Sequence, residues 1–217
     1  MIFVYRTPAA FFVSPAGRRL QKRIRSFFDD TELQGQRCIF FGSIFPFLTA
    51  FEQNAPEILW EQESIVESGF LSSLPAASGI DSAFISVLNH SVSNNLPLLI
   101  KEAERMLKPQ GRLFILSKNK TAAAAVTINE VPEIKTSFIL KELRKNDFEP
   151  QKKKSLLHFP YSAPFWEKVD KFLSVLSCGG GNFSILSARK APMVPSGIKD
   201  YKSTRITKAS VFTSPRT

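Results

Sequence analysis

The chain has 217 residues, enough for one domain with a substantial hydrophobic core and short terminal extensions. Hydrophobic residues make up 43% and aromatic residues 12%, including 20 Phe, which excludes a largely disordered chain and indicates a core that relies on aromatic rings. No apolar run reaches the roughly 18 residues of a membrane span, and two cysteines, Cys38 and Cys178, are too few for a disulfide framework or a zinc site. We therefore expect a cytoplasmic protein with reduced thiols, no metal and no membrane span.

The formal net charge of +10 is concentrated at the two ends of the chain. Residues 1–37 contain seven Lys or Arg against three acidic residues, and residues 189–217 contain seven against one, whereas the segment between them has fifteen of each. The balanced centre gives no sign of an anionic substrate in the central fold. The basic ends instead predict contact with phosphate-rich partners, including weak RNA contact.

The first predicted element is an amphipathic helix near the amino terminus. Ser14 and Pro15 form a cap and first-turn pair, and Gly35 is expected to end the element. Its apolar stripe consists of Leu20, Ile24, Phe27 and Phe28, and its basic face of Arg18, Arg19, Lys22, Arg23 and Arg25. The stripe predicts burial against a sheet. The basic face is either a solvated surface or a contact for an anionic ligand or RNA.

A continuous apolar run, Arg37 to Ser43, predicts a fully buried strand that turns at Gly42. A short helix is expected over Phe45 to Gln53 and a second strand over Glu57 to Trp60. Glu61 follows nineteen residues after Gly42, a spacing at which Rossmann-like folds place an acid against the ribose hydroxyls of a bound nucleotide. A surface acid without a ligand is the alternative interpretation of Glu61.

A β-α-β unit begins at Asp81. The apolar run Ala83 to Leu88 predicts a buried strand, and a helix follows whose apolar positions recur at spacings of three and four: Leu96, Leu99, Ile100, Ala103, Met106 and Leu107. Pro109 ends this helix, and Gly111 supplies the conformational freedom to reverse the chain into a second strand, Arg112 to Leu116. Parallel strands with a right-handed crossover set the fold class as α/β, with helices on both sheet faces.

The remaining segments complete the predicted sheet. Residues 117–135 have no strong period, and their alanine run favours a loop and helix over the pocket. A helix is expected over Ser137 to Asn146, through Phe138, Leu140 and Leu143. Lys152 to Lys154 are expected on an exposed edge strand, Leu156 to Phe159 in a sixth strand and Asn182 to Ala188 in the last strand.

This organisation predicts three parts of the chain. Residues 1–36 form a helical extension packed on the core, and residues 37–190 form the main domain. Residues 191–217 are rich in Pro, Ser, Thr, Lys and Arg and have few apolar residues, so they cannot bury enough surface to offset the entropy of ordering. We expect them to form a disordered basic tail.

The string ERMLKPQGRLFIL, which joins the helix of the β-α-β unit to its second strand, resembles the R-V-L-K-P-G-G-x-L signature of class I S-adenosylmethionine-dependent methyltransferases. Asp81 and the apolar run after it resemble the strand-four motif of that superfamily. The wider order of segments over residues 5–197 is similar to a small bacterial branch of the methyltransferase type 11-like group. The resemblance implies a Rossmann-like, doubly wound, mostly parallel sheet of about seven strands flanked by helices, and S-adenosylmethionine as the cofactor.

In that family the turn after the first strand carries G-x-G. Gly42 takes the place of the second glycine and Phe40 that of the first, so the motif is degenerate and Phe40 is expected to narrow the pocket for the cofactor's methionine end. Phe70 replaces the acid that receives the adenine amino group. The resemblance implies cofactor contacts from Phe41, Gly42, Ser43, Glu61, Ser72, Leu74 and Asn89.

His90 is the sequence's candidate catalytic residue. It follows the fourth strand, at the sheet edge where doubly wound folds bind ligands, and an imidazole can accept a proton near neutral pH. A rim histidine with a local structural role is the alternative. The sequence thus predicts methyl transfer to an unidentified small-molecule or macromolecular acceptor. The alternative function, favoured by Phe40, Phe70 and the basic ends, is a degenerate member that acts as a non-enzymatic RNA- or protein-binding module.

Overall fold

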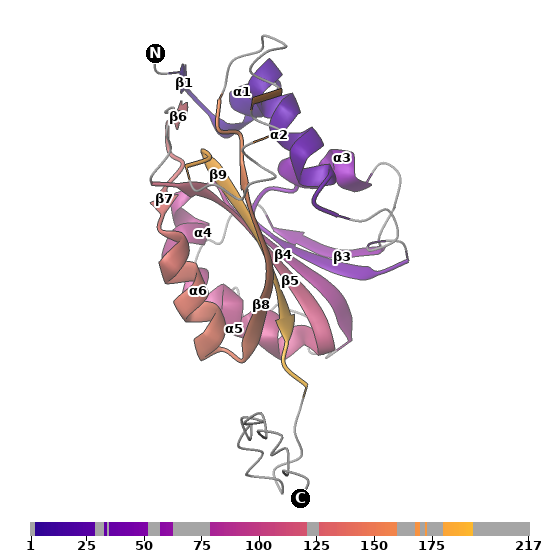
Figure 1. The fold of residues 1–217 in the computed structure, drawn as a ribbon. Helices are drawn as coiled ribbons and strands as arrows, with labels where there is room; N and C mark the ends of the chain where they lie inside the picture. The colour runs from indigo at the N-terminus through magenta and orange to yellow at the C-terminus, as the bar shows by residue number, and fades with distance from the viewer. Residues whose placement is uncertain are drawn as a thin grey trace, which may run out of the picture.

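The computed structural model describes residues 3–28, 33, 35–51, 57–62, 79–120, 126–159, 168–169, 172 and 180–192, and for residues 57–62 it describes the backbone alone. These residues form a central twisted sheet with helices on both faces (Figure 1). A second sheet of two short strands lies at one end of the molecule. The predicted α/β class is therefore confirmed.

The order of strands in the central sheet is β3-β2-β4-β5-β9-β8, with β7 paired to the end of β5. All pairs are parallel except those of β9, which runs antiparallel between β5 and β8. The strands are β2 (Arg37–Phe41), β3 (Glu57–Gln62), β4 (Ile80–Val87), β5 (Leu107–Asn119), β7 (Glu133–Ile134), β8 (Phe148–Leu156) and β9 (Phe183–Lys190). The mostly parallel, doubly wound sheet expected from the sequence is thus present.

One face of the sheet is packed with aliphatic side chains. It is covered by α4 (His90–Asn94), α5 (Leu96–Met106) and α6 (Thr136–Lys145). All six apolar positions predicted for the helix of the β-α-β unit are buried. In α6 the buried residues are Ile139, Glu142 and Leu143. The prediction that Phe138 belongs to the buried stripe is wrong: Phe138 is 43% exposed, and its neighbour Ile139 is buried instead.

The reversal predicted after α5 is a bulge of four residues within β5. Leu107 pairs with Ile80 and Arg112 with Ser82, so residues 108–111 have no partner on β4. The left-handed residue is Gln110, with φ +66°, and not Gly111. Gly111 is needed for space instead, because a Cβ there would lie 2.9 Å from the Lys108 carbonyl oxygen.

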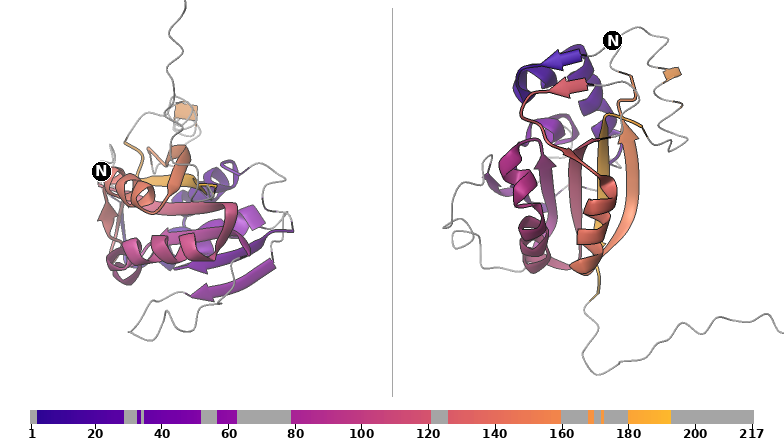
Figure 2. Two further views of the ribbon diagram at one scale, coloured as in Figure 1. Left: turned by 90° about the horizontal axis from the view of Figure 1, so that it is seen from below. Right: turned by 90° about the vertical axis from the view of Figure 1, so that its left-hand side faces the viewer.

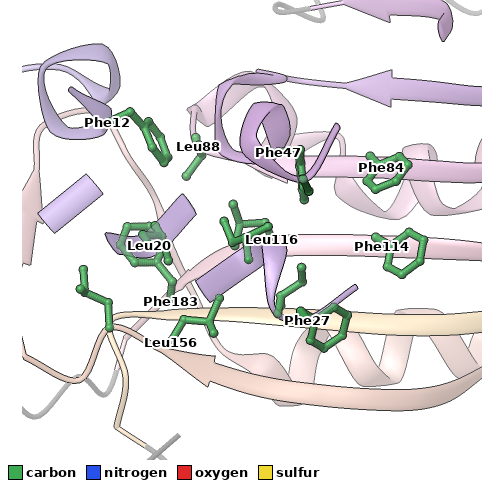
Figure 3. Packing of buried hydrophobic residues seen from close by; sticks show 14 of the residues in the cluster. Phe12, Leu20, Phe27, Phe47, Phe84, Leu88, Phe114, Leu116, Leu156 and Phe183 are labelled. Atoms are coloured by element: carbon green, nitrogen blue, oxygen red, sulfur yellow. The ribbon is translucent and has the colours of Figure 1, made fainter. Parts of the chain in front are cut away.

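The other face of the sheet is packed with aromatic rings (Figure 3). Phe84 on β4 stacks on Phe40 of β2, with 4.6 Å between ring centroids, and on Phe114 of β5 at 4.9 Å. This face is covered by α1 (Pro8–Phe12), α2 (Pro15–Arg25), the 3₁₀ turn η1 (Phe45–Phe47) and α3 (Leu48–Phe51). The rings hold the amino-terminal helices on the sheet.

The amino-terminal helix has the predicted cap and stripe. The Ser14 hydroxyl accepts a hydrogen bond from the Gly17 amide at 3.2 Å, and all four residues of the predicted stripe are buried. The predicted end at Gly35 is wrong, because α2 ends at Arg25 with Ser26 as its C-cap. Gly35 lies in a later turn with φ +67°.

Two further segments differ from the sequence-based expectation. Val126–Ile128 form β6, which pairs in parallel with β1 (Phe3–Tyr5), so the predicted helix is wrong there; the alanine run lies outside the described residues (Figure 2). Val126 and Ile128 are buried on either side of Thr127, and their strand partner comes from the distant amino terminus. The predicted sixth strand at Leu156 to Phe159 is wrong: Leu156 is the last residue of β8, which begins at Phe148 and contains the lysine triplet, and residues 157–159 follow the strand.

Candidate functional site

The predicted site residues that the structure describes lie at or just after the ends of the parallel strands β2, β3 and β4, at the edge that we call the carboxyl edge. Phe40 of β2 is level with Glu61 of β3, and Phe41 with Ile85 of β4. Gly42 follows β2 directly. Since adjacent strands lie ~5 Å apart, the Gly42 turn is flanked by the end of β3 on one side and the end of β4 on the other. This is the edge where doubly wound sheets bind ligands.

Both the backbone conformation and the available space require glycine at residue 42. Its φ is +87°, and a Cβ at this position would lie 2.5 Å from the Ser86 carbonyl oxygen and 3.2 Å from Val92 Cγ2. The turn is therefore pressed against β4 and α4. A side chain at residue 42 would disrupt the fold as well as any ligand contact.

Phe40 and Phe41 point to opposite cores. The ring of Phe40 is 1% exposed within the aromatic face, and Phe41 is fully buried among the aliphatic residues. The expectation that Phe40 narrows a cofactor pocket is wrong for this reason: side chains alternate along a strand, and that of Phe40 stacks on Phe84. Phe41 can contact a ligand at this edge through its main chain alone.

The polar residues after the strands already have local roles. Asn89 is the N-cap of α4, and its Oδ1 accepts a hydrogen bond from the Val92 amide at 2.7 Å. The Ser43 hydroxyl accepts from the Phe45 amide at 3.3 Å. His90, the first residue of α4, is exposed. Ser72, Leu74, Phe70 and the side chain of Glu61 lie outside what the structure describes.

Ser86 was not singled out from the sequence. Its side chain is 1% exposed, and its Oγ has no hydrogen-bond partner in the described part of the chain. A buried hydroxyl without a partner costs free energy, and Ser86 is also the residue whose main-chain carbonyl packs against the Gly42 turn. The sequence signal was a serine within the apolar run of β4.

The end of β5 carries a second polar group of residues that the sequence did not reveal. Lys118 is 4% exposed, and its Nζ pairs with Glu133 Oε1 at 2.8 Å. Asn119 Nδ2 donates to the Gly181 carbonyl at 2.8 Å, and its Oδ1 accepts from the Thr136 hydroxyl at 3.4 Å. These contacts fix the start of α6 against the end of β5. The sequence feature that could have revealed them is the run of three polar residues, Ser117 to Asn119, after the apolar part of the strand.

Asp81 lies at the opposite edge of the sheet, where the parallel strands begin. Its carboxylate accepts a hydrogen bond from the Arg37 amide at 2.8 Å and pairs with Lys108 Nζ. Partial burial acts to raise the pKa of Asp81, but the hydrogen bonds and charges of Lys108 and Arg37 outweigh it and lower that pKa. Asp81 therefore joins β2, β4 and the β5 bulge and is remote from the carboxyl edge.

The Cys38 thiol has no role in the candidate site. Burial, and then the charge of Asp81, raise the pKa of the Cys38 thiol to about 12, so this thiol is protonated and unreactive at neutral pH. Within the described ranges no cluster of His, Cys, Asp and Glu could hold a metal ion. Nor does any helix described there have the length and apolar character to cross a membrane.

No family model and no curated protein matches the chain. Solved structures do match it. A SAM-dependent methyltransferase from Archaeoglobus fulgidus is 14% identical, with a TM-score of 0.52 over 83% of this chain and 96% of that one. The Burkholderia thailandensis 1,6-didemethyltoxoflavin-N1-methyltransferase, solved with 1,6-didemethyltoxoflavin and S-adenosylhomocysteine, is 12% identical, with a TM-score of 0.51 over 79% and 78%.

The chain has the class I methyltransferase fold. The sequence resemblance to that fold is thus confirmed. The [4+2]-cyclase SpnF is similar to the same degree, at 16% identity and a TM-score of 0.51 over 81% of this chain and 82% of that one. Proteins named for different reactions therefore share the fold, and the reaction of this chain has to be argued from its own residues.

Proposed function

We propose that this protein transfers a methyl group from S-adenosylmethionine to an acceptor. The observation that supports this most is the register between β2 and β3. Phe40 pairs with Glu61, which brings the end of β3 beside the Gly42 turn. A glycine turn and an acid on neighbouring strand ends form the arrangement in which Rossmann-like folds hold an adenosyl group.

The chain's own residues would serve binding and positioning. The Gly42 turn, with the flanking main chain of Phe41 and Ser43, would lie against the ligand, and Glu61 would accept hydrogen bonds from the ribose hydroxyls. The Ser86 hydroxyl, which is buried and has no partner in the described residues, would be a further polar contact. When bound, S-adenosylmethionine supplies an electrophilic methyl group, and alignment of the acceptor provides much of the acceleration.

We propose His90 as the general base that takes the proton from the nucleophilic group to which the methyl group is transferred. It is exposed at the start of α4, directly after the end of β4, so its imidazole is accessible from the carboxyl edge. Asn89 contributes by capping α4 and thereby fixing the position of His90. The roles of Ser72 and Leu74 in adenine binding remain part of this proposal.

Calorimetric titration with S-adenosylmethionine and S-adenosylhomocysteine tests the proposal. The parent protein should bind both, and Glu61→Ala should lower affinity by roughly ten- to a hundredfold, because a charged hydrogen-bond acceptor is lost. Glu57→Ala is the matched control, since Glu57 lies at the opposite end of the same strand. Absence of binding by the parent protein would overturn the proposal and favour the non-enzymatic module.

A further inference from the structure

A cavity of about 300 Å³ lies beyond the carboxyl end of β5, beside the start of α6. Its lining comes from the end of β5, the start of α6 and the edge strand β8. Its polar lining consists of Asn119, Lys120, Lys135, Thr136, Ser137 and Lys153. The cavity is part of the carboxyl edge but is distinct from the Gly42 turn, since β4 lies between β2 and β5.

The lining carries three positive charges and no negative one. Lys120, Lys135 and Lys153 come from three separate segments, and none has an ion pair or side-chain hydrogen bond with another described residue. The nearby acid, Glu133, is already paired with Lys118. The even charge balance of the central sequence therefore conceals a local excess of positive charge that three-dimensional packing creates.

The position of Lys153 along β8 determines the face of the sheet on which its side chain lies. Side chains alternate along β8, so the lysine triplet is divided between the two faces of the sheet. Lys152 Nζ donates to the Phe27 carbonyl at 2.8 Å, and Lys154 Nζ lies 3.4 Å from the Ser26 hydroxyl, so both contact the end of α2. Lys153 lines the cavity on the other face.

The remaining polar groups add hydrogen-bond donors to the lysines. Ser137 provides a hydroxyl, whereas the Thr136 hydroxyl already donates to Asn119 Oδ1 at 3.4 Å, a contact that fixes the position of Thr136. No described side chain caps the amino end of the ten-residue helix α6, and the Phe138 amide already donates to the Lys135 carbonyl at 3.0 Å, so the amides of Thr136 and Ser137 are the ones that can add to the lysines. The cavity thus combines charge with several donors.

This chemistry selects phosphate among the common anions. Lysine ammonium groups act as point charges that surround a tetrahedral oxyanion, and the lining lacks the planar arginine fork that matches a carboxylate. A volume of about 300 Å³ accommodates a phosphate with part of the molecule attached to it.

We infer that this cavity binds a phosphate group of the methyl acceptor, which would be a phosphorylated small molecule. The inference depends on the proposed function. The cavity lies beyond the end of β5 and His90 follows β4, the neighbouring strand, so both are at the carboxyl edge, and the acceptor would have to span the distance between them. The cavity would then orient the acceptor, while the Gly42 turn and Glu61 hold the methyl donor.

Pyrophosphate binding to the full chain tests the site without knowledge of the acceptor. Titration followed by amide NMR should give saturable shifts at Thr136 and Ser137. Lys135→Gln and Lys153→Gln should each weaken binding by about tenfold, since each removes a charge-assisted contact. Lys141→Gln, an exposed lysine of the same helix outside the cavity, is the matched control and should leave affinity unchanged.

The same samples are titrated with S-adenosylmethionine so that the two proposals fail separately. Cofactor binding without saturable pyrophosphate binding, or equal affinities of the three variants, would overturn the phosphate site and leave the methyl-transfer proposal intact. Pyrophosphate binding without cofactor binding would overturn the methyl-transfer proposal and, with it, the acceptor assignment. Shifts confined to α2 and residues 152 and 154 would place the anion on the opposite face and refute the inference.

Discussion

The two edges of the central sheet differ in how their polar groups are satisfied. At the edge where the strands begin, Asp81 joins the Arg37 amide to Lys108, and the buried Lys190 Nζ donates to the Leu107 carbonyl at 3.0 Å and pairs with Glu104 at 3.1 Å. At the carboxyl edge, the Ser86 hydroxyl has no partner in the described residues, and His90 is exposed.

This difference separates residues that stabilise the fold from residues available for binding. Charged groups at the first edge are paired within the chain, so substitutions there should change stability. At the carboxyl edge the backbone is packed tightly around Gly42, the buried Ser86 hydroxyl has no partner in the described residues and His90 is exposed, as expected of a ligand site. The substitutions below test that division, in order of decreasing expected effect on stability.

Gly42→Ala should give the largest loss, about 2 to 5 kcal/mol in the free energy of unfolding, because left-handed strain adds to overpacking against Ser86. Gly35→Ala is the matched control: Gly35 also has positive φ but has open space around its Cβ position, so only about 1 to 2 kcal/mol is expected. Urea denaturation measures both. Equal losses would show that packing against β4 is unimportant.

Lys190→Met should cost about 2 kcal/mol, because Met retains the buried length but leaves the Leu107 carbonyl and the Glu104 carboxylate without their donor. Lys101→Met, on the exposed side of α5, provides the control and should change stability by less than about 0.5 kcal/mol. Thermal and urea unfolding both report the difference. A neutral Lys190 variant would contradict the view that this edge is stabilised by its charges.

Asn89→Ala should cost about 1 kcal/mol through loss of the N-cap of α4. Asn94→Ala, at the exposed end of the same helix, should have little effect. Hydrogen exchange at the Val92 amide gives a local measurement. If that amide remains as protected as in the parent, the cap is not the main role of Asn89.

Asp81 should make a pH-dependent contribution to the free energy of unfolding. Its folded-state pKa is lowered, so its contribution is present above the unfolded-state value of ~3.9 and is lost as pH falls through the folded-state value. Asp81→Asn should therefore reduce stability at pH 7 by under about 1 kcal/mol, given solvent screening, and flatten the stability profile below pH ~4. Glu149→Gln, exposed on β8, is the control and should leave the pH dependence of stability unchanged. If the Asp81 variant loses stability with falling pH as steeply as the parent, the prediction is wrong.

His90→Ala should have the smallest effect on stability, within about 0.5 kcal/mol, because the side chain is exposed. Turnover should fall while S-adenosylmethionine affinity is retained, once labelled cofactor has identified an acceptor. A loss of stability above about 1 kcal/mol with normal turnover would support the structural role of this histidine instead.

The sequence by itself determined the elements whose partners are close in the chain. The periodicity of α5, the Ser14 cap, the buried run of β2 and the class of the sheet all follow from local pattern, since apolar spacing records which face is buried. Tertiary structure decided the rest. It paired β6 with β1, turned Phe40 into the aromatic core and placed Gly42 against Ser86. It also brought Lys120, Lys135 and Lys153 around one cavity, because charges far apart in a balanced sequence become neighbours only when their strands and helices pack together.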